Sequence, residues 1–120
     1  MLDSAGQLRS AREAIAEAKR ALQKVKFKGL RGRIKRRRLR RRLADTEQQL
    51  AYAEKSERMG QRPPSALLGP ESRQLRDRDR RRLESGVRKT NERLYKRQVR
   101  RLGRKVRRLN VTVAKTLRAP

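Results

Sequence analysis

Arginine and lysine side chains are concentrated in one short run that could bind phosphate. Residues 31–42 read RGRIKRRRLRRR and contain nine cations and no acid. A charged group buried without a partner costs free energy, so a protein core cannot hold this run. Arginine outnumbers lysine by 28 to 10 in the whole chain, and its planar fork binds phosphate oxygens in pairs. We therefore expect the run to face water or a polyanion.

A second cationic series recurs at helical spacing near the C-terminus. Between Arg93 and Arg108 a basic side chain returns every three or four residues, which predicts a continuous ridge along a helix. Like charges four residues apart destabilise a helix by about 0.2–0.5 kcal/mol per pair, and a bound polyanion would offset that repulsion. The predicted phosphate-binding residues of both series are Lys28, Arg31, Arg33, Lys35, Arg36, Arg37, Arg38, Arg40, Arg41, Arg42, Arg93, Lys96, Arg97, Arg100, Arg101, Arg104, Lys105, Arg107 and Arg108.

Two acid-free windows hold nearly all of the net charge. Residues 18–44 contain fourteen basic residues and residues 93–120 contain eleven, against a net charge of +26 for the chain. The remaining residues are close to neutral. A protein that is basic only for solubility would spread its charge, so this concentration favours nucleic acid as the partner. The chain has one Phe, two Tyr and no Trp, which predicts contacts to the backbone and shape of nucleic acid rather than stacking on its bases.

The composition excludes several kinds of catalytic chemistry. The chain has no Cys and no His, so it has no thiol nucleophile, zinc finger or imidazole base. Asp77 and Asp79 are closely spaced carboxylates, but the surrounding arginines predict ion pairs along a helix, such as Asp77 with Arg80. No glycine-rich phosphate loop is present. We expect no enzyme activity, no metal, no cofactor and no small-molecule substrate.

Apolar residues at three- and four-residue spacing predict an all-α fold. One seam predicts a helix over residues 5–28, with Ser4 as its N-cap and Gly29 as its stop, and a second seam predicts a helix over residues 33–58. The short KGLRGR connection predicts an antiparallel, coiled-coil-like hairpin. The first seam is Leu8, Ala11, Ile15, Ala18, Leu22 and Val25, and the second is Leu39, Leu43, Thr46, Leu50 and Ala53.

A proline-rich break divides the chain. Pro63-Pro64 and Gly69-Pro70 cannot continue a helix, so we predict a hairpin at 1–58, a linker at 59–71 and one long arginine-rich helix in 72–120, with Ser72 as its cap. Two apolar seams follow on that helix and are offset by one residue, so the stripe rotates between them. They are Leu83, Val87, Thr90 and Leu94, then Tyr95, Val99, Leu102, Val106, Leu109 and Val113.

The core of this fold should be small and the molecule extended. Only 33% of residues are hydrophobic and 42% are charged, a composition close to that of disordered chains. We expect the fold to be completed when a polyanion neutralises the charge. No apolar run approaches the roughly 18 residues of a membrane span, and we expect no membrane partner.

A series of apolar and basic positions runs along the three predicted helices: Ile15, Lys19-Arg20-Ala21-Leu22, Leu39, Leu43, Leu50-Ala51, Glu57-Arg58-Met59, Tyr95, Val99-Arg100 and Arg104-Lys105. This layout resembles that of the eukaryotic Efg-type rRNA-processing factors. The resemblance implies a coiled, basic protein associated with small-subunit ribosome assembly in the nucleolus. The aromatic-rich stretch of those factors is not matched, because residues 97–102 read RQVRRL.

These patterns together predict a non-enzymatic RNA-binding protein. It would be a structural constituent or an assembly factor of a ribosome or pre-ribosome, with structured RNA, rRNA in particular, and neighbouring proteins of the particle as its partners. The alternative is a DNA-compacting or packaging protein of nucleoid or viral type. A third reading is a coiled-coil scaffold that recruits acidic proteins. For location, the nucleus or nucleolus, another ribosome-containing compartment and the mitochondrial matrix stay open.

Overall fold

The computed structural model describes residues 3–118, and its regular elements are all helical in that range. The all-α prediction is therefore confirmed. The elements are α1 (Ser4–Lys24), α2 (Gly29–Gln61), α3 (Pro64–Leu67), a 3₁₀-helix at Pro70–Gln74 and α4 (Asp77–Arg118).

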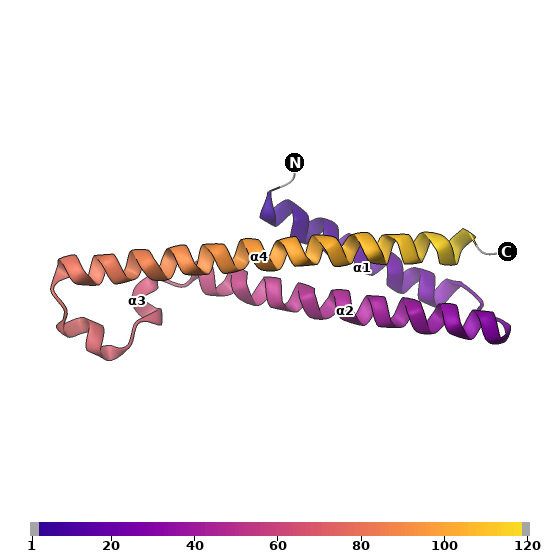
Figure 1. Ribbon diagram of the computed structural model, residues 1–120, viewed down its shortest axis with the longest axis horizontal. Helices are drawn as coiled ribbons and strands as arrows, with labels where there is room; N and C mark the ends of the chain where they lie inside the picture. Colours follow the sequence, from indigo (N-terminus) through magenta and orange to yellow (C-terminus); the bar gives the residue numbers. More distant parts are fainter. Residues whose placement is uncertain (1–2, 119–120) are drawn as a thin grey trace.

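The two longest helices, α2 and α4, form an antiparallel pair, and α1 packs against both of them (Figure 1). In the view of Figure 1, α1 starts near the middle of α4 and crosses behind it toward the end where α2 begins. The molecule measures 68 × 28 × 16 Å along its principal axes. The predicted helical hairpin with one long C-terminal helix, in an extended shape, is thus confirmed.

The core is a narrow strip where the three helices meet. Two apolar clusters follow each other along the rod, and each takes side chains from α1, α2 and α4. Alanines on α1 let the helices approach closely. The predicted seams of α1 and α2 and the second predicted seam of α4 therefore supply most of the core. The buried apolar residues are Leu8, Ala11, Ala14, Ile15, Ala18, Ala21, Leu39, Leu43, Ala53, Val99, Leu102, Leu109 and Val113.

The first half of α4 does not join this core. Leu83 keeps 46% of its surface exposed and Leu94 keeps 36%, whereas Val99 and Leu102 are almost completely buried. Two features account for the difference. The one-residue offset turns the earlier stripe by roughly 100° around the helix, and α2 ends at Gln61 and does not run beside the first turns of α4 (Figure 1).

The connection between α1 and α2 lies at residues 25–28, four residues earlier in the chain than the predicted turn at 29–32. α1 ends at Lys24, and its N-cap is Asp3, whose carboxylate accepts a hydrogen bond from the Gly6 amide at 2.7 Å. Gly29 starts α2 with a φ of +71°, a left-handed conformation that favours glycine. Gly32, predicted to lie in the turn, is buried in the first turn of α2 instead.

Gly32 is required because the chain folds back against it. A Cβ at this position would lie 2.7 Å from the backbone carbonyl carbon of Phe27. We expect Gly32→Ala to lower the free energy of unfolding by about 1–3 kcal/mol, the usual effect of overpacking. The control is Gly86→Ala in α4, where a Cβ meets no atom within 4 Å, and where alanine should stabilise the helix by up to about 1 kcal/mol. Urea denaturation followed by circular dichroism measures both, and equal effects would contradict the packing role of Gly32.

The segment between α2 and α4 is more structured than a passive linker. α2 continues to Gln61, and α4 begins only at Asp77. Ser72 lies in the 3₁₀-helix and donates its hydroxyl to the Gly69 carbonyl at 2.8 Å, so it does not cap α4. The guanidinium of Arg80 donates to the carbonyls of Ser72, Arg73 and Leu75 at 3.4, 3.1 and 3.2 Å, and it pairs with Asp77 at 3.7 Å as predicted.

Candidate nucleic-acid interface

The cationic run lies on the first half of α2 and is open to solvent. Arg31, Arg33, Arg36, Arg37, Arg38, Arg40, Arg41 and Arg42 are exposed, as is Lys28 just before the helix, and Lys35 is half-buried. None of them forms an ion pair with any group in residues 3–118. Leu39, on the same stretch, is fully buried. The helix therefore buries Leu39 in the core and keeps the cations outside, while Ile34 stays 45% exposed.

The acids of α2 lie in its second half, where they meet bases from other helices. Glu47 pairs with Lys19 of α1 at 3.0 Å, and Glu54 pairs with Arg12 at 3.2 Å. Asp45 accepts from Lys105 of α4 at 2.8 Å. None of these acids comes from the stretch of α2 that carries the run, so the run stays uncompensated.

The register between α2 and α4 decides which cations are neighbours. Gln49 is buried, and its amide donates to the backbone carbonyl and the side-chain oxygen of Gln98 at 3.0 and 2.6 Å. Since the helices are antiparallel and Asp45 contacts Lys105, residues before 45 on α2 lie beside residues after 105 on α4. The run therefore faces the last turns of α4, and the ridge lies farther along the rod, beside the acidic half of α2.

The ridge occupies the outer face of α4. Its exposed cations surround a shallow surface hollow of about 450 Å³, while Val99 and Leu102 of the same stretch point into the core. Arg107 and Arg108 are also exposed. Lys105 differs, because it is half-buried and bound to Asp45. The residues around the hollow are Arg93, Lys96, Arg97, Arg100, Arg101 and Arg104.

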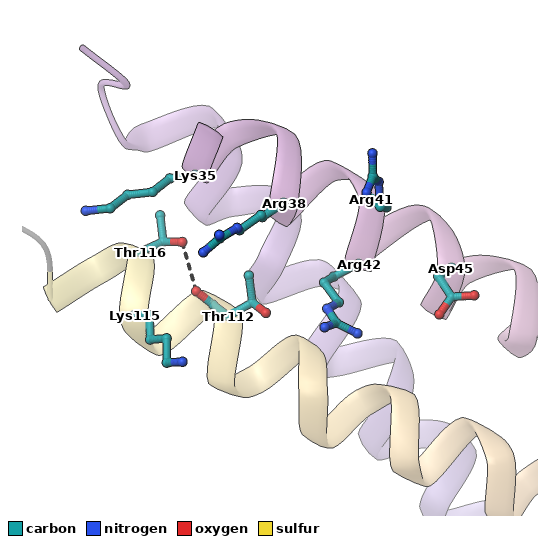
Figure 2. Close-up of a pocket in the computed structure, with 8 residues that line it drawn as sticks. All are labelled: Lys35, Arg38, Arg41, Arg42, Asp45, Thr112, Lys115 and Thr116. Atoms are coloured by element: carbon teal, nitrogen blue, oxygen red, sulfur yellow. Dashed lines mark hydrogen bonds between the residues drawn. The ribbon is translucent and has the colours of Figure 1, made fainter. Parts of the chain in front are cut away.

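A larger groove separates the first half of α2 from the last turns of α4. It has a volume of about 730 Å³. Figure 2 shows Lys35, Arg38 and Arg42 reaching from α2 toward α4, while Arg41 points away from α4. The groove is lined by Lys35, Arg38, Arg41, Arg42, Asp45, Thr112, Lys115 and Thr116.

Sequence reasoning did not single out the α4 side of this groove. Lys115 falls within the second acid-free window, and that window was the only signal for it. Thr112 and Thr116 have small side chains, and their hydroxyls donate to the carbonyls of Arg108 and Thr112 on their own helix, at 2.9 and 2.8 Å. Their place in the groove follows from the register of α2 and α4, which the spacing of charges does not encode.

The remaining polar groups of the described chain support packing. Burial, and then the 3.1 Å hydrogen bond that its hydroxyl donates to Glu57, raise the pKa of Tyr95 above its ordinary value. This phenol stays protonated at neutral pH and ties α4 to the end of α2. Within residues 3–118, three or more His, Cys, Asp or Glu side chains do not come together in a way that could hold a metal ion. In the same range no helix combines the length and the apolar character that crossing a bilayer requires.

Comparisons of the chain with protein-family models, with curated proteins and with solved structures found no match. The geometry of the two cationic surfaces, on α2 and on α4, is therefore the basis for assigning a function.

Proposed function

We propose that this protein is a non-enzymatic RNA-binding protein that serves as a structural constituent or assembly factor of a ribosome-like or pre-ribosomal particle. One observation carries the proposal. Within residues 3–118, every predicted phosphate-binding cation except Lys105 lacks an acidic partner. The ion pairs of Glu47, Glu54 and Asp77 all use bases outside the two series, and a fold that leaves its concentrated cations open in this way is suited to an external polyanion.

The shape of the molecule and its lack of stacking side chains support backbone recognition. The three aromatic side chains are dispersed: Phe27 packs against the core, Tyr95 is bound to Glu57, and Tyr52 is half exposed, with its hydroxyl accepting from Gln48. No row of aromatic rings accompanies the cations of the described chain. Phosphate contacts along a slender rod fit folded or double-stranded RNA, which proteins recognise largely by shape and backbone.

Binding as a function of salt tests this proposal. The full chain is titrated with a structured RNA and with a DNA duplex of matched sequence, at several ionic strengths. We expect tighter binding to the RNA and a steep loss of affinity with salt, since each phosphate contact contributes about −0.7 to −0.9 to the slope of log K against log salt. Tighter binding to the duplex DNA would favour the DNA-compacting alternative. An affinity that does not change with salt would overturn nucleic-acid binding altogether.

Crosslinking in cells tests whether the RNA bound by the protein is that of a ribosomal particle. RNA recovered with the endogenous protein, after nuclease-treated controls, should be enriched in rRNA. Recovery of rRNA-free complexes with acidic proteins would instead support a coiled-coil scaffold whose charge recruits those proteins.

A further inference from the structure

Ion pairs join α2 to both of its long neighbours. Between α1 and α2, Glu47 and Glu54 pair with bases, and between α2 and α4, Asp45 pairs with Lys105. Beyond Asp45, toward the start of α2, the groove between α2 and α4 gathers five cations. Its one acid is already bound to Lys105, so the groove is an uncompensated cationic hollow built by two helices.

We propose that this groove is the site that seats the nucleic-acid backbone, with Arg38 and Arg42 as its guanidinium ligands and Lys35 and Lys115 as flanking cations. The inference rests on the proposed function and refines it. It places the most closely held phosphate in a hollow formed by the tertiary fold, and the exposed arginines of the run outside the hollow make outer contacts to the flanking backbone. Arginine suits the central positions because its fork can bind two phosphate oxygens at once.

The side chains on the α4 wall keep the hollow open. Thr112 and Thr116 are small, and each donates its hydroxyl to a carbonyl of its own helix. They present short side chains where a leucine or an arginine would fill the space in front of Arg38. Such an opening in a wall facing three long cationic side chains accommodates a phosphate group and its oxygens.

Repulsion between the groove cations destabilises the free fold. Like charges that converge without an acid repel each other, and the low-dielectric helix surface strengthens that repulsion. A phosphate in the groove would reverse the sign of the interaction. Removal of the groove cations should therefore weaken RNA binding without lowering the melting temperature of the free protein, a combination that a structural role would not produce.

Two triple variants with the same change in charge test the site. The groove variant replaces Lys35, Arg38 and Arg42 with glutamine. The control variant replaces Arg36, Arg37 and Arg40 with glutamine. These three residues lie on the same stretch of α2, are exposed and do not line the groove. With an RNA hairpin as the probe, we expect the groove variant to bind about tenfold more weakly than the control variant, since it loses seated contacts and not only charge.

A second pair of variants leaves the charge unchanged. Thr112→Leu should fill the hollow and weaken RNA binding several-fold, whereas Val111→Leu, at a neighbouring position that is 53% exposed, should not change it. Circular dichroism of each free variant reports whether the helices remain. If Thr112→Leu does not fold, the two triple variants still decide the matter.

The possible outcomes distinguish failure of the groove site from failure of the proposed function. Equal weakening by both triple variants would overturn the groove site and leave RNA binding standing. Unchanged binding in both, with a wild-type affinity that still falls with salt, would also overturn the groove and assign the contacts to the ridge on α4. Unchanged binding together with a salt-independent wild-type affinity would overturn the proposed function itself.

Discussion

Glutamine in place of four arginines of the run should weaken binding of a structured RNA by on the order of 10²–10³-fold at about 0.1 M salt. The four are Arg36, Arg37, Arg40 and Arg41, which are exposed and form no ion pair within residues 3–118. Each lost phosphate contact removes about one unit from the slope of log K against log salt. The slope should therefore become flatter by up to about four units, while the helix content stays the same.

The start of α4 offers a matched control for this experiment. Arg78, Arg81, Arg82 and Arg88 are exposed and lie outside both acid-free windows. Glutamine at these four positions changes the net charge by the same amount, yet the slope and affinity should stay close to those of the wild type. A similar loss in both variants would show that only the total charge of the chain matters.

Leu39→Ala should unfold most of the free protein. Leu39 is completely buried where α1, α2 and α4 meet, and removal of a buried leucine side chain costs about 2–5 kcal/mol. Small domains have a free energy of unfolding of about 5–15 kcal/mol, and the narrow core places this protein at or below the lower end of that range, so the substitution removes most or all of its stability. Leu30→Ala in the same helix is the control, because Leu30 is 75% exposed, and its effect should stay within about 0.5 kcal/mol.

Addition of structured RNA should restore helix to the Leu39→Ala variant. A ligand that binds only the folded state at 100 times its Kd stabilises that state by about 2.7 kcal/mol. Far-ultraviolet circular dichroism of the free and RNA-bound variant measures this recovery. The wild type should gain helix on binding as well, if a polyanion completes its fold. A variant that stays unfolded at saturating RNA would argue against coupled folding and binding.

The parts of the fold that sequence predicted are those that depend on local periodicity. Apolar residues at helical spacing predicted that Ala18, Leu43 and Leu109 lie in the core, as they do. A helix with one apolar face packs that face against other helices, away from water. The offset after Leu94 likewise predicted that α4 would turn a different side to its neighbours. Exposure of Leu83 agrees with that prediction.

The parts that sequence missed depend on contacts between distant residues. Gly32 reads as a turn residue in sequence, but it lies in α2, and the approach of the Phe27 backbone explains why this helical position requires glycine. Lys105 belongs to the ridge by spacing, but its partner Asp45 lies sixty residues earlier in the chain. No sequence pattern indicates that Thr112 and Thr116 line the groove, because their position there depends on the register of α2 against α4.

The buried Gln49 side chain fixes the position of α2 along α4. Any slip of α2 against α4 would leave its amide without the two Gln98 oxygens, at a cost of about 1–3 kcal/mol. Gln49 thereby fixes which residues of α2 lie opposite the threonines of the groove, and the rise of α4 places those threonines about 20 Å from the centre of the ridge. Under the proposed function, two cationic surfaces at a fixed interval would select RNA by the distance between its phosphate strands and not by its bases.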